Sequence, residues 1–159
     1  MTAMKNWIKD NYKNWAVYLI LSVLLKYISI KTNSTFLDDF IKDNLILLLP
    51  ALLAVNVTTI SILLTKIYDL KKEFPSVSFK EPILAMRNSI TEQIILVLLA
   101  TISLILREGK AIGLFTSENG QNFLSVFLIM LAISAIQIVL DTANALFNFL
   151  STEDEITNA

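Results

Sequence analysis

Long apolar runs separated by short polar segments are the main pattern in this sequence. Four runs cover residues 15–31, 44–65, 88–107 and 120–141. A helix that crosses a bilayer needs about 20 predominantly apolar residues. The second run and nearly all of the fourth contain no charged residue, whereas the first and third reach this length only with charged residues at their ends. The pattern predicts an all-α, multi-pass membrane protein, with a four-helix transmembrane bundle in a single domain.

Two segments outside these runs also have helical spacing. From Ile60 to Leu70 apolar residues keep the helical repeat until Pro75 ends it, and Pro82 suits the first turn of the next helix. We therefore expect residues 66–92 to form a helical hairpin in the cytosol. In the N-terminal arm, aromatic and apolar residues share one helical face beside a stripe of lysines, which predicts a short interfacial helix. The apolar face consists of Met4, Trp7, Ile8, Tyr12 and Trp15.

The distribution of Lys and Arg predicts the orientation in the membrane. One side holds eight basic residues, namely Lys5, Lys9, Lys13, Lys66, Lys71, Lys72, Lys80 and Arg87. The other side holds four, namely Lys31, Lys42, Arg107 and Lys110. Because basic residues accumulate on the cytoplasmic side, we expect both termini in the cytoplasm, at the inner membrane of a bacterium, with residues 151–159 as an acidic cytoplasmic tail. Lys26, near the outer end of the first span, is expected to extend its ammonium group to water.

The composition narrows the classes of function. The chain is 55% hydrophobic and 17% charged, whereas a soluble domain has about 25% charged residues, so the excess apolar surface requires membrane lipids. The net charge of −1 gives no sign of direct nucleic-acid binding. The chain has no Cys and no His, which removes disulfides, thiol nucleophiles, histidine bases and the usual zinc or haem ligands. We expect no enzyme, no cofactor, no metal site and no catalytic residue.

Asp141 stands inside the otherwise apolar run 134–150. A helix of about 20 residues from Asn122 brings it to the inner membrane interface. Lys66 and Glu92 fall at the same depth on neighbouring spans, so the three residues are predicted to form interfacial ion pairs. Two interpretations stay open, which are ordinary anchoring at the headgroups and a collar that fixes the helices or gates a passage.

Asn56 is the polar residue nearest the middle of a predicted span. An Asn within a membrane can form hydrogen bonds between helices. We interpret Asn56 as a helix-packing residue, either within the bundle or between subunits, and on this basis we expect a homo-oligomer. A position lining a pore is the alternative.

The 66–92 hairpin carries basic and aromatic residues together. Aromatic residues and Arg are enriched in the cores of protein interfaces. We predict that a cytosolic protein partner docks at Lys71, Lys72, Phe74, Phe79 and Arg87. In the alternative interpretation the lysines only set the topology and the Phe side chains enter the headgroup region.

These features leave three classes of function. The chain is expected to be a non-enzymatic sensor or scaffold subunit that recruits a cytosolic partner; the alternatives are a small oligomeric pore or effector, and a membrane immunity or exclusion protein. The stretches "NVTTISILLTKIYDL", "MRNSITEQIILVLLA" and "QIVLDTANALF", with the overall size, resemble the small four-span membrane subunit of the Kiwa anti-phage defence system. The resemblance covers roughly a quarter of the chain and implies a homo-oligomeric membrane assembly that senses phage attack and holds a cytosolic DNA-binding partner.

Overall fold

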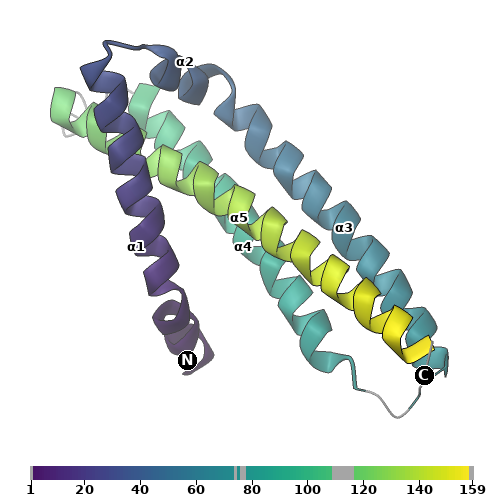
Figure 1. Cartoon of the computed structure of the whole chain (residues 1–159). Helices are drawn as coiled ribbons and strands as arrows, with labels where there is room; N and C mark the ends of the chain where they lie inside the picture. The colour runs from purple at the N-terminus through teal and green to yellow at the C-terminus, as the bar shows by residue number, and fades with distance from the viewer. Residues whose placement is uncertain (1, 74, 76–77, 109–116, 158–159) are drawn as a thin grey trace. The chain divides into compact units, whose positions relative to one another are not determined.

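The described part of the chain is helical. The structure, a computed structural model, describes residues 2–73, 75, 78–108 and 117–157, and it describes side chains within 14–148 of these ranges. It consists of helices α1 (Thr2–Lys31), α2 (Phe36–Asp43), α3 (Leu45–Glu73), α4 (Lys80–Glu108) and α5 (Glu118–Thr157) (Figure 1). No strand occurs in these ranges. The all-α fold predicted from the apolar runs is therefore confirmed.

Four of the helices are long and apolar enough to cross a membrane. They are α1 from Asn14 onward, α3, α4, and α5 as far as Asn148. Helices α3 and α4 have 29 residues each and α5 has 40, more than the roughly 20 that a bilayer requires. The extra length confirms that the helical pattern continues beyond residue 65, before residue 88 and after Asp141. This composition fits a multi-pass membrane protein.

Two segments differ from, or extend, what the sequence led us to expect. The segment after α1, for which the sequence analysis predicts no helix, contains the eight-residue helix α2. The N-terminal arm is helical as predicted, but it is continuous with the first span in α1. The predicted position of this arm at the membrane interface stays a prediction.

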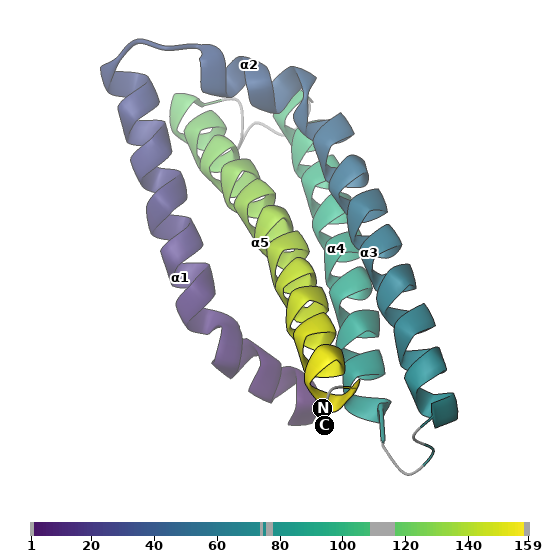
Figure 2. The same cartoon turned by 45° about the vertical axis from the view of Figure 1, so that its right-hand side comes forward.

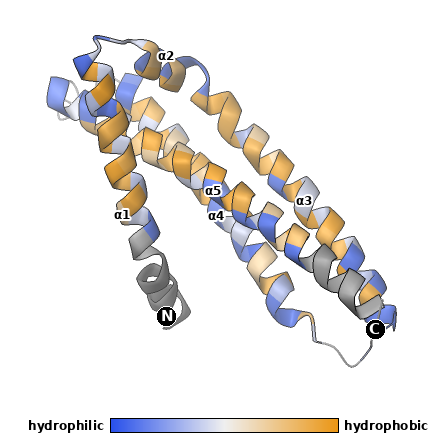
Figure 3. Ribbon diagram, viewed as in Figure 1, coloured by the Kyte–Doolittle hydropathy of each residue, from blue (hydrophilic) through white to orange (hydrophobic). Residues whose placement is uncertain are grey.

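On α1 polar residues are buried and apolar residues are exposed, which is the reverse of the pattern in a soluble protein. From Asn14 onward, the buried residues of α1 are Ser22, Lys26 and Ser29, which recur at helical spacing, whereas Val17 is 58% and Ile20 67% exposed. Apolar residues dominate the described turns of α1 and much of α3 (Figure 3). Large exposed apolar surfaces are unfavourable in water, and polar groups in a membrane face the protein interior. This arrangement is therefore suited to contact with lipid tails.

The chain forms two compact units, which we describe separately. Unit 1 comprises Met1–Leu47 and Leu98–Ser134, and unit 2 comprises Leu48–Val97 and Ala135–Ala159. The core of unit 1 includes Ile41 of α2 and Leu45 of α3, together with Ala100, Leu124 and Leu128. The single transmembrane domain expected from the sequence concerns the whole chain and stays a prediction.

In unit 2, α3 packs through one narrow stripe. Its buried residues follow one another at intervals of one or two helical turns. They are Leu49, Asn56, Ile60, Leu63 and Ile67. The segments of α3 and α4 in this unit lie side by side (Figure 2) and are joined by hydrogen bonds from Asn56. Since α3 is apolar on nearly all sides, hydrophobicity alone does not select its inward face. The polar residue Asn56 distinguishes it.

Candidate functional site

A tight turn ends α1 and leads the chain into α2 (Figure 2). Asn33 has a φ of 49°, a left-handed conformation that Asn tolerates better than most residues. The N–H of Ser34 donates to the carbonyl of Ser29 at 3.0 Å, and the N–H of Asn33 makes the companion bond at 3.2 Å. These two bonds define a Schellman motif. The turn places α2 so that Asp38 comes within hydrogen-bonding distance of Lys26.

Residues from four helices meet at the carboxylate of Asp38 in unit 1. The ammonium group of Lys26 (α1) lies 2.8 and 3.0 Å from its two oxygens. Nη2 of Arg107 (α4) donates to Oδ1 at 3.2 Å, and the hydroxyl of Ser125 (α5) donates to the same oxygen at 3.1 Å. We call these four residues the Asp38 cluster. It ties α1 and α2 to the end of α4 and the start of α5 within this unit.

Both cations of the Asp38 cluster are largely shielded from solvent. The side chain of Lys26 is 8% exposed and that of Arg107 13%, whereas Asp38 is 35% exposed. The prediction that Lys26 extends to water is therefore wrong, because a carboxylate from α2 reaches the ammonium group inside the unit. Within the described part of the chain, Nη1 of Arg107 is buried without a hydrogen-bond partner. Because Lys26 and Arg107 share the single carboxylate of Asp38, the cluster holds more positive than negative charge.

The pKa of Asp38 reflects these surroundings. Partial burial raises the pKa of the carboxyl, but the hydrogen bond and charge of Lys26, the hydroxyl of Ser125 and the charge of Arg107 together outweigh that effect. The net result is a pKa below the ordinary value of 3.8. The carboxylate is therefore ionised at neutral pH and offsets part of the cost of shielding the two cations from water.

Unit 2 contains a second polar arrangement, centred on Asn56. Its amide nitrogen donates to Oε1 of Gln93 at 2.8 Å and to the hydroxyl of Ser89 at 3.0 Å. The Ser89 and Thr142 hydroxyls are 3.2 Å apart, and Thr142 donates its proton to the carbonyl of Ile138. A hydroxyl has one proton to donate, so Ser89 is the donor to Thr142. The bonds run in one direction from α3 through α4 to α5.

Gln93 completes this network, whereas one side-chain atom of Asn56 makes no hydrogen bond within the described residues. Gln93 is fully buried, and its amide nitrogen lies 3.5 Å from the carbonyl of Ala135 in α5. Asn56 is also fully buried, and its Oδ1 has no hydrogen-bond partner within the described residues. These bonds place Asn56 in contacts within the chain, one of the two arrangements that the sequence left open. Contact between subunits through Asn56, and the homo-oligomer itself, stay predictions.

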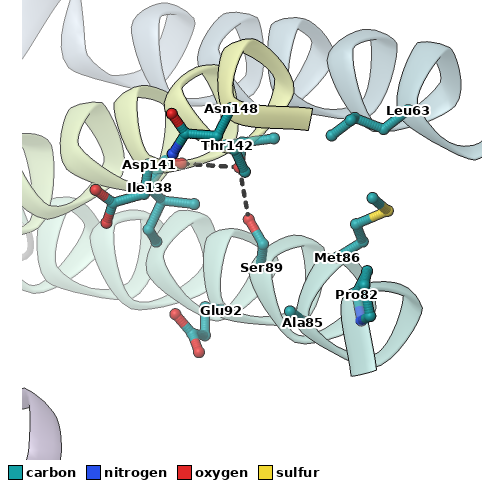
Figure 4. A pocket seen from close by; sticks show the side chains of 11 residues that line it. Leu63, Pro82, Ala85, Met86, Ser89, Glu92, Ile138, Asp141, Thr142 and Asn148 are labelled. Atoms are coloured by element: carbon teal, nitrogen blue, oxygen red, sulfur yellow. Dashed lines mark hydrogen bonds between the residues drawn. The ribbon is translucent and has the colours of Figure 1, made fainter. Parts of the chain in front are cut away.

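A cavity of about 490 Å³ lies between α4 and α5 in unit 2, with Leu63 of α3 on its third side. Ser89 and Thr142 face each other across the two helices (Figure 4). Glu92 and Asp141 both line the cavity. Its remaining lining residues are mainly apolar or small, namely Pro82, Ala85, Met86, Ile138, Ala145 and Asn148.

Two of the three predicted boundary charges line the cavity of unit 2. Glu92 and Asp141 line the same cavity, and Lys66 is half-buried on α3 outside that lining. Asp141 is exposed and accepts a hydrogen bond from Nε2 of Gln137, one turn earlier in α5, at 2.8 Å. The predicted ion pairing of these residues at a membrane interface stays a prediction.

The predicted docking residues lie at the connected ends of α3 and α4. Lys71, Lys72 and Arg87 are exposed, and Phe79 is half-buried just before α4. The Lys72 ammonium lies 4.4 Å from the centre of the Tyr68 ring and 4.0 Å from the carboxylate of Asp69. Phe74 is outside the described residues.

Neither polar centre resembles a metal site. Within the described ranges, no group of three or more His, Cys, Asp or Glu residues is placed to hold a metal ion. The Asp38 cluster joins its helices by ion pairs and hydrogen bonds, and the network around Asn56 joins its helices by hydrogen bonds alone. The chemical effect of both is to fix those helices. Comparison with protein-family models, curated proteins and solved structures finds no match for this chain. The resemblance to the Kiwa membrane subunit therefore rests only on the sequence stretches that suggested it.

Proposed function

We propose that this chain is a non-enzymatic, multi-pass membrane scaffold, a sensor subunit that holds a cytosolic protein partner at the inner membrane of a bacterium. The contrast between buried and exposed polar groups in unit 2 carries the proposal. The buried amides and hydroxyls, around Asn56 and Gln93, are used in bonds between helices. The charged residues at the connected ends of α3 and α4 are exposed, including Lys71, Lys72 and Arg87.

A fixed helical stem with an exposed, mixed-charge end suits recognition of a protein. The helices of unit 2 are tied together by bonds that order the stem before any partner arrives, which lowers the entropy cost of binding. Charges at its exposed end favour specific association through electrostatic complementarity. The resemblance to the Kiwa membrane subunit makes a cytosolic DNA-binding protein the first partner to test, with anti-phage defence as the setting.

Docking at the exposed end predicts a specific loss of the partner. Lys72→Gln combined with Arg87→Gln should reduce the co-purified partner by about tenfold, because both substitutions remove interface charges without introducing new ones. The measurement is affinity purification in mild detergent, with quantitative mass spectrometry of the proteins recovered. Lys42→Gln, which changes an exposed lysine of α2 in unit 1, is the matched control and should leave recovery unchanged.

Two results would contradict the scaffold. Equal recovery of the partner with the double variant and the wild type would remove the docking surface. Steady ion conductance of the wild-type chain in planar bilayers, together with no partner recovered, would favour the oligomeric pore instead.

The proposed orientation predicts a labelling pattern. Because the chain has no Cys, single Ser34→Cys, Ser76→Cys and Ser117→Cys variants each report one position. An impermeant maleimide added to intact cells should label positions 34 and 117 and spare position 76, as the Lys/Arg distribution requires. Labelling after cell lysis controls for reactivity. Labelling at position 76 alone in intact cells would reverse the topology and place the proposed docking surface outside the cytosol.

A further inference from the structure

The cavity of unit 2 has the size and chemistry of a ligand site. Its volume is about 490 Å³, within the range of roughly 300–1,000 Å³ typical of small-molecule pockets. Most of its lining side chains are apolar or small, and Glu92 and Asp141 contribute the charged groups of that lining. A ligand that satisfies both features has an apolar body and a positive charge.

The two ends of the cavity are lined by different residues. On α4 the lining runs from Pro82 to Glu92, and on α5 it runs from Ile138 to Asn148. The Ser89–Thr142 contact of 3.2 Å and the Gln93–Ala135 contact of 3.5 Å together show that residue numbers rise along one helix as they fall along the other. Glu92 therefore lies toward the end of the cavity that Asp141 and Ile138 line. The opposite end is lined by Pro82 and Asn148, so both carboxylates belong to the same end.

Small side chains leave room beside the helix contact. Ala85 on α4 and Ala145 on α5 lie on the side of the Ser89–Thr142 contact away from the carboxylates. Neighbouring apolar side chains outside the cavity are exposed, including Leu84 at 52% and Leu140 at 51%. The cavity is therefore set in the kind of surface that contacts lipid tails, where amphiphilic molecules are concentrated.

We propose that this cavity binds an amphiphile consisting of a primary ammonium group on an alkyl chain. The ammonium group is held by the carboxylates of Asp141 and Glu92, and the alkyl chain lies along the apolar walls toward Ala85 and Ala145. The amine of a phosphatidylethanolamine headgroup and a free long-chain amine share this chemistry. The site is separate from the proposed docking surface, because Lys71, Lys72 and Arg87 do not line the cavity.

The test uses the purified full chain and dodecylammonium as the probe. Binding is measured by native mass spectrometry and by titration in phosphatidylglycerol nanodiscs, with uncharged dodecanol as the matched ligand. The wild type should bind one dodecylammonium saturably and dodecanol about tenfold more weakly, because a charge-assisted hydrogen bond is lost. Competition by phosphatidylethanolamine in the nanodisc identifies the lipid headgroup as the source of the amine, and its absence identifies a free amine.

Variants separate the site from nonspecific partitioning. Asp141→Asn and Glu92→Gln should each weaken binding of dodecylammonium by about tenfold. Glu81→Gln, which neutralises an exposed carboxylate of α4 outside the cavity lining, should not change it. Ala145→Phe should block the alkyl chain, so that dodecylammonium and dodecanol both lose affinity. Far-ultraviolet circular dichroism checks that each variant keeps its helices, and Asp141→Asn is a mild test because that side chain is exposed.

Three results would overturn the site. These are equal affinity for dodecylammonium and dodecanol, unchanged binding by both carboxylate variants, and binding of a lysine-rich peptide through Asp141 and Glu92 with no binding of the amine amphiphile. The last result would assign the cavity to a protein ligand. None of these results depends on recovery of a cytosolic partner, so this proposal and the scaffold can fail separately.

Discussion

Asp38→Asn should lower the free energy of unfolding in detergent by about 2–3 kcal/mol. Removing one partner of a fully buried ion pair costs roughly 3–5 kcal/mol, since the remaining charge is left uncompensated. Asp38 is 35% exposed, so solvent screening reduces that figure. Its loss nevertheless leaves Lys26 and Arg107 shielded from water without their shared carboxylate. Chemical denaturation followed by circular dichroism in a mild detergent measures the change.

The neighbouring residue supplies the matched control. Asp39→Asn removes the same charge from the same helix, but Asp39 is exposed, so its effect should stay within about 0.5 kcal/mol. Adding Lys26→Met to Asp38→Asn should restore part of the lost stability, because one of the uncompensated cations is then absent. Equal effects of the two aspartate substitutions would show that the Asp38 cluster does not hold unit 1 together.

The same carboxylate predicts a specific dependence on pH. Its pKa is lowered in the folded state, so its contribution is fully present above the ordinary value of 3.8 and is lost as the pH falls through the lower, folded value. The stability difference between wild type and Asp38→Asn should therefore be constant from neutral pH down to about 4 and should shrink below that. A difference that shrinks already near neutral pH would contradict a lowered pKa.

Gln93→Leu should destabilise unit 2 by about 1–2 kcal/mol, and more than Asn56→Leu does. Hydrogen bonds between membrane helices contribute about 0.6–2 kcal/mol. Removing Gln93 takes an acceptor from the Asn56 amide and leaves Asn56 buried with its Oδ1 still unsatisfied. Removing Asn56 instead eliminates that unsatisfied oxygen, which offsets part of the two lost bonds. Denaturation in detergent measures both effects.

Thr58→Val on the same helix controls for loss of a polar group. Thr58 is exposed and donates to the carbonyl of Ala54 within its own helix, so the substitution should have little effect. The double variant Asn56→Leu with Gln93→Leu should cost less than the sum of the single substitutions, because the two residues share a bond. A larger loss from Asn56→Leu than from Gln93→Leu would show that the unsatisfied oxygen has no energetic weight.

The spans were predictable because they depend on local composition. Uninterrupted apolar runs indicate α3 and α5 directly, and helical spacing with Pro75 and Pro82 indicates where the α3–α4 connection begins and ends. Helix α2 was missed because it is short and lies between two spans. A signal was present, since Phe36, Leu37, Phe40 and Ile41 are amphipathic and two aspartates occupy the first turn of that helix.

The polar centres were harder to predict because their partners are distant in the sequence. Asp38 contacts residues 12, 69 and 87 positions away, and the periodicity of a single helix contains no information about such pairs. Asn56 was interpreted as a packing residue from its depth alone. Its partner Gln93 was not singled out within the third apolar run, although a fully buried amide is a natural partner for a membrane Asn.

The Asp38 cluster also bears on how the chain enters a membrane during synthesis. Lys26 leaves the ribosome with the first span, and its carboxylate partner follows only 12 residues later, whereas Arg107 and Ser125 follow after two further spans have been made. The Lys26–Asp38 pair is thus the first tertiary contact of the cluster available to the nascent chain. It neutralises the ammonium group of α1 early and leaves a carboxylate at the end of that span, ready to receive Arg107. The order of translation is therefore also the order in which Lys26, Arg107 and Ser125 become available to Asp38.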